Sequence, residues 1–169
     1  MNNKFDIIVI GSGPAGGAVT RLCLAAGKKL AVVDYLYGGA CALRGCTPRK
    51  AMEAVCSHYW AARDLRGRGI SAIPPVRWLD LQHHKQQFIK SVPENTISYF
   101  RTLGATVLEG EAHFTGPHTL EVDGRNYEAG IIVLATGAHP RRLSLEGSEQ
   151  LISNQQFFEL TELPHRILF

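Results

Sequence analysis

Two cysteines separated by four residues, Cys41 and Cys46, have the spacing of a pair that can close a small disulfide loop. Glycines surround the pair, and Pro48 is placed to start a helix just after the second cysteine. At a helix N-terminus the dipole favours a thiolate over a thiol, and the thiolate is the reactive form of cysteine. The stretch from Gly38 to Lys50 therefore predicts thiol chemistry.

Three interpretations of Cys41 and Cys46 compete. As metal ligands the two thiolates need two more partners, and the sequence offers no second cysteine pair to complete such a site. As a structural disulfide the pair closes a loop too small to gain much entropy, and four cysteines are too few for a secreted scaffold. The third interpretation, a redox dithiol, is favoured, and we expect no metal site.

A glycine-rich turn lies between a predicted strand and a predicted helix near the start of the chain. Residues 5–10 are nearly all apolar, which is typical of a buried parallel strand. Residues 17–26 predict a helix that Gly27 ends, and residues 29–34 predict a second strand. Together these elements predict a βαβ unit with its turn at residues 11–16.

This turn has the GxGxxG pattern of a dinucleotide-binding site, with glycines at positions 11, 13 and 16. The first permits a tight turn, the second lets the backbone approach a pyrophosphate, and the third lets helix and strand pack closely. Asp34 ends the second strand eighteen residues after Gly16, where it can accept hydrogen bonds from ribose hydroxyls. Dinucleotide binding is therefore predicted. The alternative is a doubly wound fold with an empty turn.

Composition restricts the class of protein. The chain has 169 residues, a length sufficient for one domain with a hydrophobic core. Of these residues, 45% are hydrophobic and 20% are charged. A net charge of +3 permits an anionic ligand, but it is smaller than the positive charge typical of a nucleic-acid-binding domain. The sequence has no secretory signal and no apolar run of membrane-spanning length. We therefore expect a cytoplasmic enzyme that binds neither nucleic acid nor membrane.

The rest of the sequence predicts helices followed by strands. One helix is expected over 48–66 and another over 79–103, broken near Pro93. Strands are expected over 107–114, 119–122 and 126–129 as an antiparallel group with a hairpin turn at Asp123-Gly124, and over 131–135 as a buried strand. A short helix near 153–159 and a strand starting at 165 complete the pattern. The predicted class is α/β, Rossmann-like, with a parallel central sheet and a small antiparallel β-meander.

Three motifs resemble the FAD domain of the pyridine nucleotide-disulfide oxidoreductases, the family of glutathione reductase, dihydrolipoamide dehydrogenase and mercuric reductase. They are the GxGxxG turn, the segment Gly38-Gly39-x-Cys41-x-x-x-Gly45-Cys46-x-Pro48-x-Lys50, and Ala135-Thr136-Gly137. The motifs follow the family's order and approximate spacing, and the resemblance covers the whole chain. It departs from the family at Ala40, where threonine is usual, and at Asp34, where glutamate is usual.

The resemblance implies that the dinucleotide is FAD and that NAD(P)H is the co-substrate. In such enzymes electrons pass from the nicotinamide to the flavin, then to a disulfide, here Cys41–Cys46, and on to a small-molecule disulfide or a related acceptor. Cys41 would attack the substrate, Cys46 would face the flavin, and Lys50 would stabilise charge on the flavin ring. The residues expected to bind the cofactor are Gly11, Gly13, Pro14, Ala15, Gly16, Asp34, Gly39, Ala40, Gly45, Ala135, Thr136 and Gly137.

The resemblance also implies a longer, multidomain enzyme. Complete members run to roughly three times this length, with several domains of ~100–200 residues. The sequence holds no second GxGxxG, and it lacks the later FAD segment and the dimerisation domain of the complete homodimer. We therefore interpret residues 1–169 as an incomplete FAD-binding domain, inactive by itself as a reductase. The alternative is a stand-alone flavin- or nucleotide-binding module, or a thiol-switch subunit without catalytic turnover.

Overall fold

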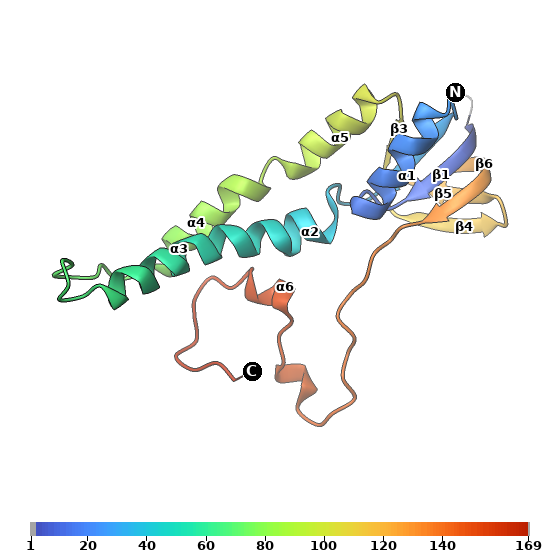
Figure 1. The fold of residues 1–169 in the computed structure, drawn as a ribbon. Helices are drawn as coiled ribbons and strands as arrows, with labels where there is room; N and C mark the ends of the chain where they lie inside the picture. Colours follow the sequence, from blue (N-terminus) through green and yellow to red (C-terminus); the bar gives the residue numbers. More distant parts are fainter. Residues whose placement is uncertain (1–2, 169) are drawn as a thin grey trace. The chain divides into compact units, whose positions relative to one another are not determined.

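The computed structural model describes residues 3–168, which form two compact units (Figure 1). The first unit contains the described residues up to Cys41 together with Ser91–His139. The second contains Ala42–Lys90 and the described residues from Pro140 onward. The first unit is therefore discontinuous in sequence, with part of the second inserted between its halves.

A six-stranded sheet is the centre of the first unit, with strand order β3-β2-β1-β6-β5-β4. The strands are β1 (Lys4–Ile10), β2 (Leu30–Asp34), β3 (Thr106–Glu109), β4 (Ala112–Gly116), β5 (Thr119–Val122) and β6 (Arg125–Leu134). β3, β2, β1 and β6 run parallel, whereas β4, β5 and the start of β6 form an antiparallel meander. The predicted α/β class, with a parallel sheet and a small meander, is confirmed.

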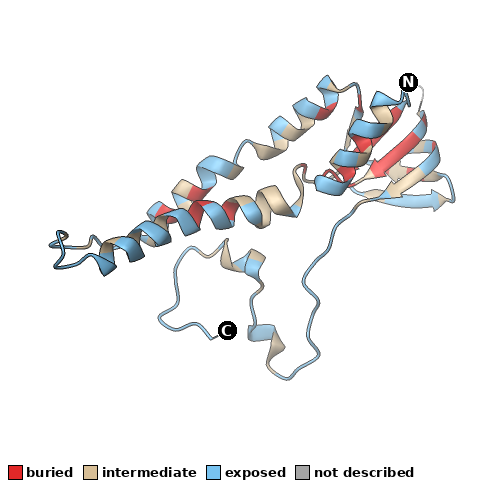
Figure 2. Ribbon diagram, viewed as in Figure 1, coloured by how far each residue is buried: buried red, intermediate tan, exposed pale blue. Residues whose placement is uncertain are grey.

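The two faces of this sheet are buried in different ways. One core cluster joins Ile8 and Val33 of the parallel strands to Leu120 and Val122 of the meander. A second cluster joins other residues of β1 and β2 to Phe100 of helix α5 (Val92–Thr102) and to side chains of helix α1 (Pro14–Ala25). The parallel strands thus have the meander on one face and helices on the other. Figure 2 marks β1 as largely buried.

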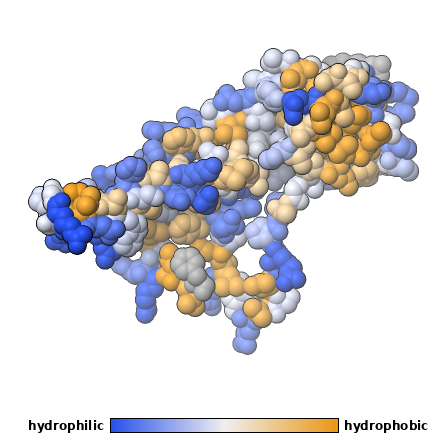
Figure 3. Space-filling view, viewed as in Figure 1, coloured by the Kyte–Doolittle hydropathy of each residue, from blue (hydrophilic) through white to orange (hydrophobic). Residues whose placement is uncertain are grey.

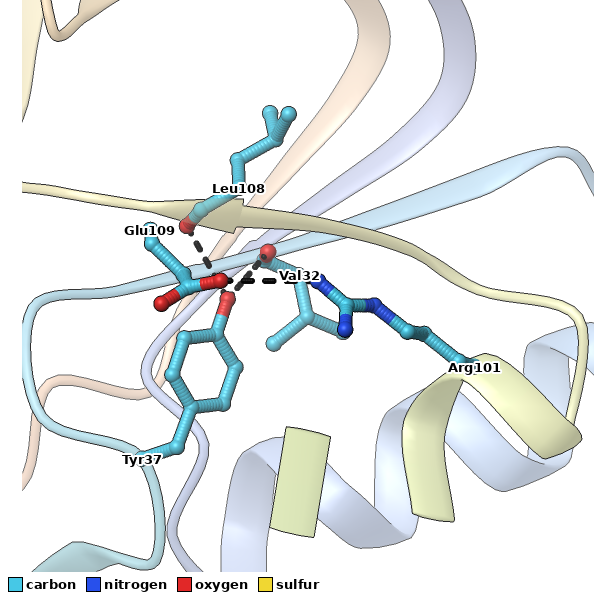
Figure 4. Close-up of polar contacts among 5 residues, drawn as sticks. All are labelled: Val32, Tyr37, Arg101, Leu108 and Glu109. Carbon is cyan, nitrogen blue, oxygen red and sulfur yellow. Dashed lines mark hydrogen bonds and ion pairs between the residues drawn. The ribbon is translucent and has the colours of Figure 1, made fainter. Parts of the chain in front are cut away.

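Tyr37 joins two strands of the parallel sheet through its side chain (Figure 4). Its hydroxyl lies 2.8 Å from the carbonyl oxygen of Val32 on β2 and 2.9 Å from that of Leu108 on β3. The residue is only 2% exposed. Burial, and then the negative charge of Asp34, raise the pKa of Tyr37 well above its ordinary value.

The second unit is built from helices. Helix α3 (Cys46–Asp64) packs against α4 (Trp78–Ile89), and Figure 2 marks buried positions on both. A 3-10 helix, η1 (Ser148–Gln150), and a short helix, α6 (Asn154–Phe157), follow later in the chain. Ser153 caps α6 by accepting a hydrogen bond from the backbone N–H of Gln156, whose side chain bonds back to Ser153.

Side chains of α4 hold the chain that follows α6. Trp78 Nε1 and Gln82 Nε2 both donate to the carbonyl oxygen of Leu160, at 2.8 and 3.0 Å. The ammonium of Lys85 donates to the carbonyl oxygen of Phe158. Burial lowers the pKa of Lys85, and the charge of Glu159 opposes that shift. The segment is thus attached to α4 by side-chain bonds to main-chain oxygens.

The structure differs from the prediction in four places. Residues 107–114 are not one strand, because Gly110, at a φ of +147°, separates β3 from β4. The strands expected at 126–129 and 131–135 are one continuous strand, β6. The cysteine segment contains an unexpected helix, α2 (Gly39–Arg44). Residues 165–168, expected to start a strand, are irregular, and Phe169 lies outside the described residues.

Apolar side chains are exposed on β6, the strand that pairs in parallel with β1 and antiparallel with β5. Figure 3 shows apolar surface gathered over the sheet of the first unit. Ile131 and Leu134 of β6 are 58% and 66% exposed.

Over residues 3–168, no helix has both the length and the apolar character that a membrane crossing requires.

Replacing Tyr37 with phenylalanine tests the link between β2 and β3. We expect Tyr37→Phe to lower the free energy of unfolding at pH 7 by about 1–2 kcal/mol, because the two carbonyls lose a buried partner. The raised pKa adds a pH signature. Above the ordinary pKa of about 10, only the unfolded tyrosine ionises, so the wild-type advantage shrinks by about 1.4 kcal/mol over the first pH unit. Chemical denaturation of both proteins at pH 7 and 11 measures this difference. An advantage that does not change with pH would contradict it.

Candidate functional site

The N-terminus of α1 lies directly after the glycine-rich turn at the end of β1. Gly13 is the N-cap, and the N–H of Gly17 makes the first helical bond, at 2.8 Å to the Gly13 carbonyl oxygen. The first N–H groups of a helix have no acceptor within it. After Pro14, Ala15 is exposed at this helix end, whereas Gly16 is buried. Pro14, at the first helical position, has no N–H. Such a helix end favours an anion, because backbone N–H groups and the dipole point toward it.

Two glycines of the turn occupy places that no side chain could share. A Cβ atom on Gly11 would lie 2.2 Å from the carbonyl oxygen of Ala135, just beyond β6. A Cβ on Gly16 would lie 1.9 Å from the carbonyl oxygen of Gly11. Both positions therefore require glycine for folding itself. The same contacts bring the third motif, which starts at Ala135, against the first.

The second glycine segment meets the turn at Gly13. A Cβ on Gly39 would lie 2.5 Å from the Cα of Gly13, and Gly39 has a φ of +70°. In the reverse direction a Cβ on Gly13 would meet only the Cα of Gly39, at 3.6 Å, an ordinary contact. Gly13 is thus not required for packing. Its missing side chain leaves room beside the helix N-terminus.

Asp34 connects the turn to the segment that follows β2. Its Oδ2 accepts hydrogen bonds from the backbone N–H of Ser12, at 2.8 Å, and from the Ser12 hydroxyl, at 2.6 Å. Its Oδ1 accepts a bond from the N–H of Leu36, at 3.1 Å. The Ser12 hydroxyl oxygen in turn accepts a bond from the N–H of Gly38, at 2.9 Å. The expectation that Asp34 binds ribose hydroxyls stays a prediction.

The candidate thiols belong to different units. Cys41 lies in α2 and belongs to the first unit, whereas Gly45, Cys46 and Lys50 belong to the second. Cys46 is the first residue of α3, after its N-cap Gly45, and is exposed with a free thiol. Lys50 is exposed in the same helix. The start of this helix confirms the sequence prediction to within two residues.

The first unit also places the remaining expected cofactor residues. Ala40 is exposed in α2, next to Gly39, and Thr136 and Gly137 are exposed just after β6. The structure therefore brings together residues of all three predicted motifs: the glycine turn, Gly39 of the second and Ala135 of the third. Among residues 3–168, no group of three or more histidine, cysteine or acidic side chains could hold a metal ion.

Sequence reasoning missed Ser12 and Tyr37. Ser12 occupies a variable position of GxGxxG, so the pattern itself gives no signal for it. A serine 22 residues before an acid at a strand end is also too common to single out. Tyr37 lies between the acid and the glycine pair, and only the pairing of β2 with β3 shows why it is there.

Comparison with known proteins places these observations in a family. Residues 5–168 match the pyridine nucleotide-disulphide oxidoreductase family. A glutathione reductase of Burkholderia cepacia is 30% identical over 165 residues, which cover 96% of this chain and 37% of the relative. A glutathione reductase of Nostoc sp. is 30% identical over 170 residues, which cover 99% of this chain and 37% of the relative.

A relative with another name matches at a similar level. A dihydrolipoyl dehydrogenase of Mycoplasma pneumoniae is 29% identical over 175 residues, which cover 98% of this chain and 38% of the relative. The chain thus spans little more than a third of the length of the curated relatives it matches.

The contact between Gly39 and Gly13 can be tested with a matched pair of variants. Gly39 and Gly27 have φ values of +70° and +73°, but a Cβ on Gly27 meets nothing within 4 Å. We expect Gly27→Ala to lower the free energy of unfolding by about 1 kcal/mol, from backbone strain alone. Gly39→Ala should lower it by at least about 2 kcal/mol more, because the two backbones must separate. Equal losses in urea denaturation would show that the close approach is unimportant.

Proposed function

The chain belongs to the pyridine nucleotide-disulphide oxidoreductase family, and from that premise we propose that its first unit binds FAD at the N-terminus of α1. Members of this family are FAD-dependent oxidoreductases that use NAD(P)H as co-substrate. Residues 1–169 would then be an FAD-binding domain, or a large part of one, within a longer enzyme. The relatives' much greater length supports this assignment.

One observation carries the proposal: the open side of Gly13 at the helix N-terminus. Three backbone segments converge there, and Gly11 and Gly39 serve that packing, whereas a side chain on Gly13 would meet no close contact. A glycine that packing does not require, beside free helix N–H groups, suits the approach of a diphosphate. The N–H group of Ala15, an exposed residue at this helix end, would bind it.

The other expected contacts complete the fit to an extended dinucleotide. Ala40 follows Gly39 on one side of the turn, and Thr136 and Gly137 follow β6 on another. All three are exposed and carry small side chains or none, so they leave space for a ligand. The acid at the end of β2 is the remaining group of this cradle. We therefore propose that FAD binds to the first unit without any rearrangement of the buried side chains of that unit.

Cys41 and Cys46 are proposed to exchange electrons with a disulfide substrate. The thiolate of Cys41 would attack one sulfur of the substrate, forming a mixed disulfide and releasing one thiolate. The thiolate of Cys46 would then attack the sulfur of Cys41, which releases the second substrate thiolate and closes the Cys41–Cys46 disulfide. Bound FAD would supply the electron pair, taken from NAD(P)H, that reduces this disulfide again. Lys50 would stabilise negative charge on the flavin ring.

The substrate class and assembly extend the proposal to the longer enzyme. Relatives named glutathione reductase and dihydrolipoyl dehydrogenase support a small-molecule disulfide as the acceptor. We further propose a homodimer in the cytoplasm, where reducing conditions keep a catalytic dithiol available. Residues 1–169 would bind the cofactor without turning over NAD(P)H by themselves.

Titration with FAD tests the site. We expect the chain to quench flavin fluorescence on binding, and Gly13→Ala to weaken FAD binding at least tenfold, because the methyl group would occupy the diphosphate's place. The same variant should change the free energy of unfolding without FAD by less than about 1 kcal/mol, since its Cβ meets only an ordinary contact. Wild-type binding that Gly13→Ala leaves intact would refute the assigned position. A chain that stays free of FAD at high FAD concentration would refute the cofactor.

Mild oxidation tests the dithiol. We expect one disulfide to form within the chain, removing two of its four thiols from alkylation, and peptide mass spectrometry should assign it to Cys41 and Cys46. Cys41→Ser and Cys46→Ser should each abolish it, whereas Cys56→Ser, which removes another exposed thiol, should not. Formation of a Cys46–Cys56 disulfide instead would contradict the pairing.

A further inference from the structure

The acid of the cofactor cradle bonds mainly to the protein itself. The carboxylate of Asp34 accepts three hydrogen bonds, two from Ser12 and one from the N–H of Leu36. A carboxylate offers about four acceptor positions in all. Only about one position is therefore left for a ligand, too few to accept a hydrogen bond from each of two ribose hydroxyls.

Ser12 transmits this interaction to the second glycine segment. The residue is 5% exposed, so its hydrogen bonds are shielded from water. Since the hydroxyl hydrogen is donated to Asp34 at 2.6 Å, the hydroxyl oxygen is free to accept the N–H of Gly38 at 2.9 Å. The bond from the Ser12 hydroxyl to the carboxylate of Asp34 is charge-assisted, and such bonds are stronger than those between neutral groups. The carboxylate thus fixes the serine rotamer, and the serine fixes Gly38.

This chain of bonds controls a contact that the cradle needs. Gly38 precedes Gly39, whose backbone lies against Gly13 so closely that a Cβ on Gly39 would fall 2.5 Å from the Gly13 Cα. Gly39 is also the first residue of α2, which carries Cys41. The hydrogen bond at Gly38 therefore holds Gly39 close to Gly13, the two glycines that border the diphosphate site. It also holds the residue at which α2, the helix of Cys41, begins.

We propose that Asp34 is a positioning residue for FAD binding, which acts through the Ser12 hydroxyl to hold Gly38 and Gly39 against the glycine turn. This inference rests on the proposed function. It differs from direct binding of the ribose by Asp34, because in that case the Ser12 hydroxyl would contribute nothing to affinity. The two roles predict different coupling between substitutions at positions 12 and 34.

A double-mutant cycle on the 169-residue chain separates these roles. FAD dissociation constants are measured by flavin fluorescence for wild type, Ser12→Ala, Asp34→Asn and the double variant. We expect Ser12→Ala to weaken binding about tenfold, which is about 1.4 kcal/mol. The double variant should bind within about twofold of Asp34→Asn alone, because each substitution breaks the same connection. If the two effects multiply instead, or Ser12→Ala binds within twofold of wild type, the positioning role is overturned.

Rescue and control variants exclude a general loss of stability. Ser12→Thr keeps the hydroxyl and should restore affinity to within about threefold of wild type. Thr20→Val removes another fully buried hydroxyl, one that has no hydrogen-bond partner among the described residues, and should leave affinity unchanged within twofold. If Ser12→Thr binds as weakly as Ser12→Ala while both unfold at the wild-type temperature, the hydroxyl is not the active group and the proposal fails.

A readout without FAD distinguishes failure of this inference from failure of the proposed function. Hydrogen exchange at the Gly38 amide should be slow in wild type and Ser12→Thr and faster in Ser12→Ala, whether or not FAD binds. Fast exchange at Gly38 in the wild type would overturn the inference at its first step. Wild type that shows slow exchange but never binds FAD would overturn the proposed function, and with it the cofactor-binding role given to Asp34. Should Ser12→Ala not fold, Asp34→Asn carries the same comparison of exchange and affinity.

Discussion

Backbone segments at the carboxyl ends of β1, β2 and β6 approach one another more closely than side chains would permit. Gly11 lies against Ala135, Gly16 against Gly11, and Gly39 against Gly13, so three distant stretches of sequence meet around one helix N-terminus. Everything assigned to the first unit depends on this approach. It places free N–H groups beside an open space, and it fixes where the cysteine helix begins. The two core clusters, one on each face of the sheet, stabilise the register of β1 with β2 and β6 and so keep these strand ends side by side.

Much of this arrangement could be predicted from the sequence, because local signals and the final packing agree there. The apolar run of β1, the glycine turn, the helix stop at Gly27 and the acid after β2 each indicate the same βαβ unit. The hairpin at Asp123-Gly124 was equally clear: both residues have positive φ, at 49° and 71°, which an Asp-Gly pair accommodates. The break between α4 and α5 lies where Pro93 indicated it.

The errors arose where partners distant in sequence decide the structure. Residues 107–114 are continuous in β-propensity, yet β3 pairs in parallel with β2, and β4 pairs with β5 at the other end of the strand order. A single glycine, Gly110, allows the chain to leave one edge for the other. The short helix α2 begins at glycine, a poor helix former, so propensity argued against it. The Ser12–Asp34 connection required the register of the turn, which no local pattern encodes.

The discontinuity of the first unit also bears on how the chain folds during synthesis. Ile7 of β1 pairs with Leu30 of β2 and with Ile131 of β6, so one neighbour of the central strand is translated soon after it and the other more than a hundred residues later. Non-local parallel pairing of this kind slows folding, because a long loop must close before its contacts form. Until β6 leaves the ribosome, β1 has a partner on one edge only. The helical insert, whose α3 and α4 contact each other locally, can assemble during that interval.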